Sequence, residues 1–125
     1  MTNKVPREHI EQVTFLNWFA ETYSGVKILA IPNGGYRHPN EAVKLKIEGV
    51  LKGVPDLFVP EWNLWIEMKR ISGSKILREQ AQFADYVRDV CGHSHIFAFG
   101  WQDASEKVMR FNESKTRSIE IMERG

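Results

Sequence analysis

Segments with helical and with strand-like spacing alternate along this chain, and that alternation limits its fold more than any other feature of the sequence. Apolar residues recur at helical spacing in three long segments and one short one, residues 7–23, 40–51, 76–90 and 102–107. Strand-like runs separate or follow them at residues 26–31, 56–59, 64–70 and 94–99. The resulting αβαββαβ order predicts an α/β domain with a mixed central β-sheet flanked by helices.

Turn-forming residues mark the ends of these segments. Gly25 closes the first helix, whose expected apolar face includes Ile10 and Val13, and Asn40 begins the second. The four residues 60–63 join two strand-like runs, which predicts an antiparallel hairpin.

The length and composition favour one soluble domain. With 125 residues, of which 42% are hydrophobic, the chain can bury a single core, so we expect one domain over residues 1–125 with 113–125 as a loose tail. No apolar run is long enough to span a bilayer, and residues 1–9 lack a secretory signal. Cys91 is the only cysteine, which favours a reducing cytoplasm and argues against a structural zinc site. A net charge of +1 neither indicates nor excludes nucleic acid as a partner.

The predicted hairpin brings two carboxylates together. If Val59 pairs with Leu64, Asp56 lies opposite Glu67, with Cβ atoms about 5 Å apart. Lys69 lies two residues after Glu67 and therefore shares its strand face. Two adjacent carboxylates repel each other unless a cation lies between them, and hard oxygen ligands suit Mg²⁺. The hairpin thus predicts a metal site.

Each of these residues also has a purely structural interpretation. Glu67 and Lys69 alone would be typical of a solvated strand face, and Asp56 after a proline is typical of a turn. Gln80, however, shares a helical stripe with apolar residues, which indicates a buried polar partner. Glu11 on the first helix is either a third carboxylate of the site or a rim residue.

The polar segment 33–38, together with the lysine-bearing helix that follows it, offers contacts to a phosphate backbone. Its glycines permit close approach to a ligand, its cations pair with phosphates, and its tyrosine can stack on an unpaired base. The candidate DNA-binding residues are Asn33, Tyr36, Arg37, Lys44 and Lys46. The alternative is a surface loop on a solvated helix, where Glu41 and Glu48 balance the lysines. No helix-turn-helix or zinc-finger motif is present, which favours recognition of DNA shape over base readout.

Taken together, these motifs resemble the virus-type replication-repair nuclease (VRR-NUC) family of the PD-(D/E)xK nuclease superfamily. The resemblance rests on Gly53-Val54-Pro55-Asp56-Leu57, Glu67-Met68-Lys69, Gln80 and the segment Ile31-Pro32-Asn33-Gly34-Gly35-x-Arg37. The family usually has a serine at the start of the helix after the catalytic strand, which the run 76–80 lacks. Both Glu8 and Glu11 match the family's first-helix glutamate, and the spacing to Gly25 favours Glu11.

The resemblance implies a restriction-endonuclease-like core and a metal-dependent DNA endonuclease. It implies that Asp56 and Glu67, with Glu11, hold Mg²⁺ or Mn²⁺ in its place. It further implies that Lys69 orients or deprotonates the attacking water or stabilises the transition-state charge, while Gln80 positions the nucleophile or Lys69. The implied substrates are branched, flapped or Holliday-junction DNA in DNA repair, in the cytoplasm of a bacterial or phage-infected cell.

Two other functions remain open. One is a catalytically silent DNA-binding module of the same fold, against which the intact set of Asp56, Glu67 and Lys69 argues. The other is an unrelated phosphate-handling enzyme, against which the absence of a nucleotide-binding glycine loop argues.

The four tryptophans lie in separate segments, which together with the resemblance predicts a homodimer that presents two active sites to two DNA strands.

Overall fold

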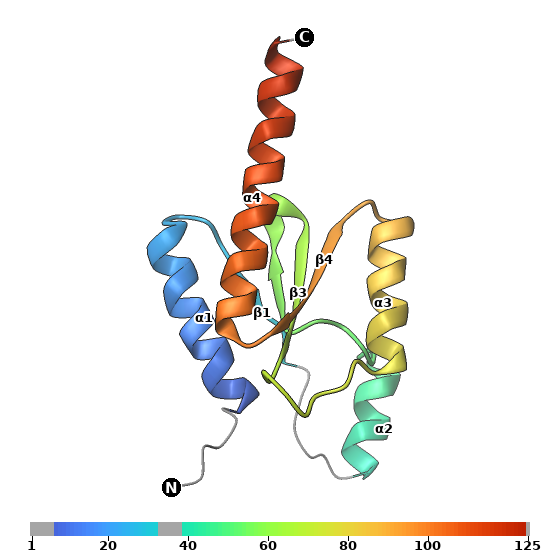
Figure 1. Cartoon of the computed structure of the whole chain (residues 1–125). Coiled ribbons are helices and arrows are strands. Elements are labelled where there is room, and N and C mark those ends of the chain that lie inside the picture. Colours follow the sequence, from blue (N-terminus) through green and yellow to red (C-terminus); the bar gives the residue numbers. More distant parts are fainter. Residues whose placement is uncertain (1–6, 33–38, 125) are drawn as a thin grey trace, which may run out of the picture. The chain divides into compact units, whose positions relative to one another are not determined.

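The computed structural model describes residues 7–32 and 39–124 (Figure 1). The elements follow in the order α1 (Glu8–Thr22), β1 (Leu29–Ala30), α2 (Pro39–Ile47), β2 (Leu57–Val59), η1 (Pro60–Trp62), β3 (Leu64–Lys69), α3 (Arg78–Asp89), β4 (Ser94–Phe99) and α4 (Trp101–Arg124). They form two compact units. The first comprises residues 7–26, 68–74 and 96–124, and the second comprises 27–32, 39–67 and 75–95. The prediction of one domain stays a prediction.

The hairpin of β2 and β3 forms as predicted. Pro60 opens a single 3-10 turn, and Asn63 completes the reversal in the left-handed conformation with φ 48°. The strands are antiparallel, and Val59 pairs with Leu64. The four-residue connection therefore sets the predicted register.

The sheet is mixed, as expected from the sequence. Its strand order is β1-β2-β3-β4, and the pairs β1·β2 and β2·β3 are antiparallel. The strand β4 runs parallel to β3. The N–H of Ser94 donates to the carbonyl of Asn63, and the N–H of Gly100 donates to the carbonyl of Lys69. Between these two hydrogen bonds both strands advance by six residues in the same direction. Such a sheet with flanking helices confirms the predicted α/β class.

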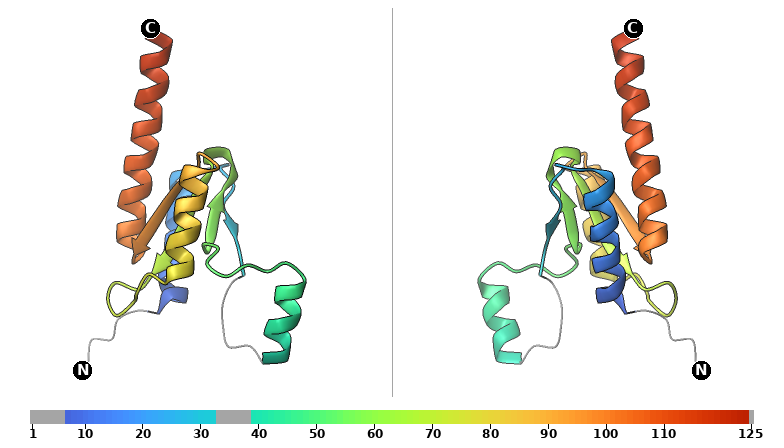
Figure 2. Two further views of the ribbon diagram at one scale, coloured as in Figure 1. Left: turned by 90° about the vertical axis from the view of Figure 1, so that its right-hand side faces the viewer. Right: turned by 90° about the vertical axis from the view of Figure 1, so that its left-hand side faces the viewer.

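Two expected segments are shorter in the structure. The strand predicted over 26–31 has ladder pairing only at Leu29–Ala30, and the helix predicted over 40–51 ends at Ile47. Figure 2 shows α2 away from the strands of its unit in both views. Its apolar Val43 and Ile47 are accordingly exposed, at 59% and 81%.

The first unit is built on α1 and α4, which pack against each other (Figure 1). The buried residues of α1 are Glu11, Phe15 and Phe19, at spacings of four. The predicted apolar face of this helix is wrong at Ile10, which is 54% exposed, and at Val13, which is also exposed. Burial follows the position of α4, which the local pattern of α1 does not encode.

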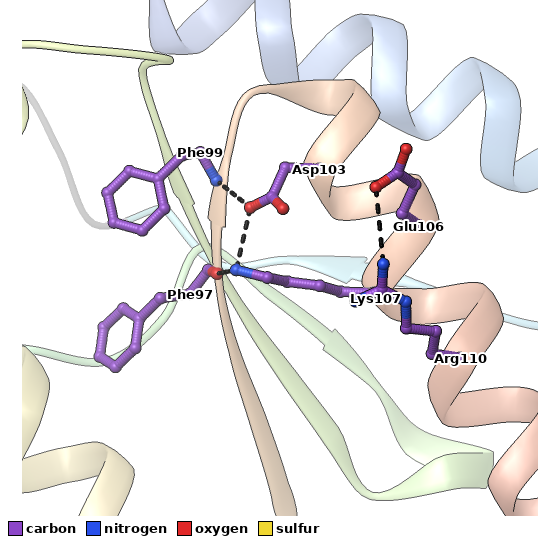
Figure 3. A network of polar contacts seen from close by, with 6 residues as sticks. All are labelled: Phe97, Phe99, Asp103, Glu106, Lys107 and Arg110. Carbon is purple, nitrogen blue, oxygen red and sulfur yellow. Dashed lines mark hydrogen bonds and ion pairs between the residues drawn. The ribbon is translucent and has the colours of Figure 1, made fainter.

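The C-terminal segment is one continuous helix. Neither the short helix expected over 102–107 nor the loose tail at 113–125 is correct up to residue 124, because α4 runs over 24 residues. Figure 3 shows the contacts that fix its first turns. Asp103 accepts the N–H of Phe99 at 2.8 Å, and Lys107 donates to the carbonyl of Phe97 at 2.7 Å and pairs with Asp103 at 2.9 Å. These contacts connect β4 to α4 without a loop.

Two further expectations concern the surface. None of the helices in the described parts of the chain has the length and apolarity needed to cross a membrane. All four tryptophans are half-buried, and the homodimer expected from them stays a prediction. Met122 and Ile121 near the end of α4 are far more exposed, at 80% and 70%.

Candidate active site

Asp56 lies in a bend directly before β2, where two conformational constraints precede it. Gly53 has φ +88°, a conformation that residues with a Cβ rarely adopt, and Pro55 is buried. The carbonyl of Asp56 accepts the N–H of Ile31 at 2.7 Å, which fixes its main chain beside β1. The side chain is half-buried. The turn thus positions Asp56 at the start of the hairpin.

Glu67 occupies the position opposite this bend. The hairpin ladder ends at the pair of Leu57 with Ile66, so one further step of the same register sets Asp56 against Glu67. Glu67 is 4% exposed, and Lys69, two residues later on the same face of β3, is 5% exposed. A solvated strand face is therefore excluded for both residues.

Gln80 has the buried polar partner that the sequence predicts for it. Its Nε2 donates to Glu67 Oε1 at 2.7 Å, while its Oε1 accepts the N–H of Leu77 at 2.9 Å. Leu77 is the N-cap of α3 and has no capping hydroxyl, so the Gln80 amide satisfies an N–H that would otherwise lack an intrahelical partner. Both ends of the amide are held, which fixes its orientation toward Glu67.

Gly53 was missed as a site residue, although the sequence shows it at the start of the Asp56 motif. A Cβ at this position would overlap the main-chain carbonyl oxygen of Glu79 and lie 2.5 Å from the carbonyl carbon. Glu79 belongs to the first turn of α3, next to Gln80. Only a glycine permits this close approach, and the loop before Asp56 thereby packs directly against the turn that presents Gln80.

Glu11 belongs to the other unit and has a definite structural role there. It is 3% exposed, and its Oε2 accepts the N–H of Trp101, the first residue of α4, at 2.8 Å. A carboxylate at a helix N-terminus is stabilised by the free N–H groups and the helix dipole. Glu8, the alternative first-helix glutamate, is exposed.

Gly100 allows the contact that Glu11 makes. It has φ +91°, and a Cβ there would lie 2.5 Å from Glu11 Oε2 and 2.7 Å from Ile71 Cγ1. Neither Gly100 nor Trp101 was predicted from the sequence as a site residue. The signal for both was a glycine between a strand and an acidic first helical turn.

The remaining predicted residues divide into two groups. Lys44 and Lys46 are exposed on α2, as a phosphate contact requires, whereas Asn33, Tyr36 and Arg37 lie outside the described residues. Within residues 7–32 and 39–124, no three His, Cys, Asp or Glu side chains form a group suited to a metal ion. The geometry therefore unites Glu67 with Gln80 and sets Asp56 opposite Glu67, while the metal roles of Asp56, Glu67 and Glu11 stay predictions.

Comparison with known proteins finds a likeness among solved structures. No family model and no curated protein matches the chain. Among solved structures, a protein described as "VRR_NUC domain protein" superimposes with a TM-score of 0.72. The two sequences are 22% identical, and the match covers 87% of this chain and 90% of the other. Over most of its length, the chain therefore has the fold of a VRR-NUC domain protein.

Proposed function

We propose that this protein is a metal-dependent DNA endonuclease that hydrolyses phosphodiester bonds. The observation that carries the proposal is the buried Glu67 carboxylate, held by Gln80 at 2.7 Å and set opposite Asp56, on a VRR-NUC fold. A buried carboxylate is costly unless donors or cations compensate its charge. A cation held by Asp56 and Glu67 would compensate this charge and would also neutralise the negative charge that develops on the reacting phosphate.

The proposed metal is Mg²⁺, with Mn²⁺ as a substitute. The donors on the hairpin are carboxylate oxygens, which suit a hard cation that keeps several water ligands. Asp56 and Glu67 would hold the ion, and Glu11 is proposed as a further or water-mediated ligand. When bound, the ion would polarise the phosphoryl oxygen and lower the pKa of the attacking water.

Each protein group then has its own task. Gln80 keeps the Glu67 carboxylate in one orientation through the contact that Leu77 fixes at its other end. Lys69 would orient or deprotonate the attacking water, or stabilise the charge of the transition state. Lys44 and Lys46, with Asn33, Tyr36 and Arg37, are proposed to grip the DNA backbone.

The proposed substrate is branched, flapped or Holliday-junction DNA, cleaved during DNA repair in the cytoplasm of a bacterial or phage-infected cell. A homodimer would present two active sites to two strands.

The proposal of a homodimer is based on Ile119 and Met122, two apolar residues that lie on one face of α4 and are 47% and 80% exposed. Light scattering tests it, since a mass that stays near 14.5 kDa at all concentrations would exclude a dimer.

A cleavage assay tests the main proposal. Linear, flapped and four-way-junction DNAs are incubated with the protein and Mg²⁺, or with excess chelator. We expect cleavage only with Mg²⁺ or Mn²⁺. Undiminished cleavage in chelator would contradict the metal mechanism.

Variants separate the site from the rest of the protein. We expect Asp56→Asn, Glu67→Gln and Lys69→Ala each to lower the rate on the order of a thousandfold, because each removes several kcal/mol of transition-state stabilisation. Glu61→Gln is the matched control, since Glu61 is an exposed glutamate in the hairpin connection. Near wild-type cleavage by Lys69→Ala would refute the assignment. DNA binding by the wild-type protein without cleavage of any substrate would instead indicate a silent binding module.

A further inference from the structure

A second candidate site lies in the unit that contains Asp56, Glu67 and Gln80. It is an open hollow of about 380 Å³ between the segment that follows α2 and one side of α3. The residues that line it are Leu51, Lys52, Glu79, Gln82, Phe83 and Tyr86. This volume is within the range of small-ligand sites in proteins.

We propose that the hollow binds an unpaired nucleobase of the DNA substrate. This inference rests on the proposed nuclease function and specifies its substrate. Phe83 and Tyr86 offer aromatic surfaces, with ring centroids 6.3 Å apart, and Tyr86 is 53% exposed. Bases stack on such side chains whatever their sequence, because every base has a π-face. Glu79 and Gln82 add an acceptor and a mixed donor and acceptor for the polar edge of the base.

The aromatic wall is supported from behind. The ring of Trp65 meets that of Phe83 edge-on at 5.2 Å and packs on Phe58 at 4.2 Å. Trp65 Nε1 also donates to His93 Nδ1 at 3.1 Å, which holds the indole in place. Phe83 is therefore fixed before any ligand arrives, so little side-chain entropy is lost there on binding.

The hollow is adjacent to the proposed chemistry. Phe58 pairs with Trp65 in the hairpin, and the next pair on the same face is the position of Asp56 and Glu67. On α3, Phe83 follows Gln80 by three residues, a rise of about 4.5 Å along the helix. A nucleotide next to the scissile phosphate thus has an aromatic surface within reach.

The charges of the hollow favour a base over a phosphate. The Glu79 carboxylate repels a phosphate, whereas it accepts hydrogen bonds from the exocyclic amines and ring N–H groups of bases. Lys52 at the rim can pair with the backbone phosphate of the same nucleotide. A paired base has both faces stacked in the duplex and cannot enter, so the hollow selects DNA with a flap, a gap or an open junction.

Binding of 2-aminopurine DNA tests this inference. The fluorescent base is incorporated at the first unpaired position of a flap, and a fully paired duplex of the same sequence is the comparison. Binding is measured in the Asp56→Asn background, in which cleavage does not interfere. We expect Tyr86→Ala to raise the Kd for flapped DNA about tenfold or more while the Kd for duplex stays within about twofold. Tyr86→Phe should bind as the parent protein does, because the ring is retained.

The control is Val90→Ala, a truncation of a 70% exposed residue at the end of the same helix that is not among the residues lining the hollow. An equal loss of flap and duplex binding in Tyr86→Ala, or no loss of either, would overturn the base site. Wild-type protein is assayed on the same flap with Mg²⁺. If it cuts the flap while Tyr86→Ala binds normally, the base site is wrong and the nuclease proposal stands. If it neither binds nor cuts DNA, both proposals are overturned.

Discussion

Substitution of Gly53 tests the link between the Asp56 loop and α3. The change to Ala costs free energy in two ways, through the backbone conformation and through steric overlap, and other glycines of this chain test the first cost alone. A left-handed backbone costs an L-residue roughly 1–2 kcal/mol. The added Cβ would also overlap the main-chain carbonyl of Glu79, and relief of such crowding typically costs about 1–3 kcal/mol more. We therefore expect Gly53→Ala to lower the free energy of unfolding by roughly 2–5 kcal/mol.

Gly25 and Gly49 are matched controls for the backbone cost. Their φ angles are +87° and +98°, and a Cβ at either would meet nothing within 4 Å. Substitution of either by Ala should lower the free energy of unfolding by only about 1–2 kcal/mol. Urea unfolding measures all three variants, with the slope m checked for constancy. Equal losses at Gly53 and Gly25 would refute the close packing of the loop on α3.

The same substitution has a catalytic readout. Displacement of the first turn of α3 moves Gln80 away from Glu67, so Gly53→Ala should lower the cleavage rate under conditions in which the variant stays folded. In a Gln80→Ala background this additional loss should largely disappear, because the two changes act through one contact. Fully additive losses would show that Gly53 acts on the rate by another route.

Three further predictions follow from individual buried groups. Burial, reinforced by nearby Arg88, lowers the pKa of His95 from 6.5 to about 4, so the unfolded chain binds more protons between these values. The stabilisation from neutral His95 is complete above pH 6.5 and declines toward pH 4, by up to about 2 kcal/mol from pH 7 to pH 5. In urea unfolding, the free energy of unfolding of His95→Gln should lack this decline. A variant that loses stability with falling pH as the wild-type protein does would contradict the assignment to His95. Glu11→Ala should lower the free energy of unfolding by about 1–3 kcal/mol through loss of the Trp101 contact, and Glu11→Gln should lower it by less. If Glu11 also binds the metal, the folded Glu11→Gln protein should lose cleavage. Retained cleavage would confine Glu11 to its structural role. Phe19→Ala should cost about 3–5 kcal/mol in thermal or urea unfolding, and Ile10→Ala less than about 1 kcal/mol; similar costs would contradict the observed burial of α1.

Much of the predicted site depends on local rules, which the sequence contains. The residues 60–63 are too few for anything but a tight reversal, which sets Asp56 opposite Glu67. Because side chains in a strand alternate between two faces, Lys69 lies on the same face of its strand as Glu67. Gln80 was conspicuous because a polar amide interrupted an apolar stripe. The structure confirms its buried partner as Glu67. The ion and the DNA remain proposals, because their recognition depends on molecules outside the chain.

The order of helices and strands, and the register of the β2–β3 hairpin, follow from the sequence alone, because period, turn residues and caps act over a few positions. Only the tertiary structure decided which face of α1 is buried, that β4 runs parallel to β3, and that α4 continues to Arg124. It also decided that Glu11 accepts the N–H of Trp101, 90 positions away in the chain. The physical reason is that burial and capping depend on the element that packs against a residue, and a local pattern does not specify that neighbour.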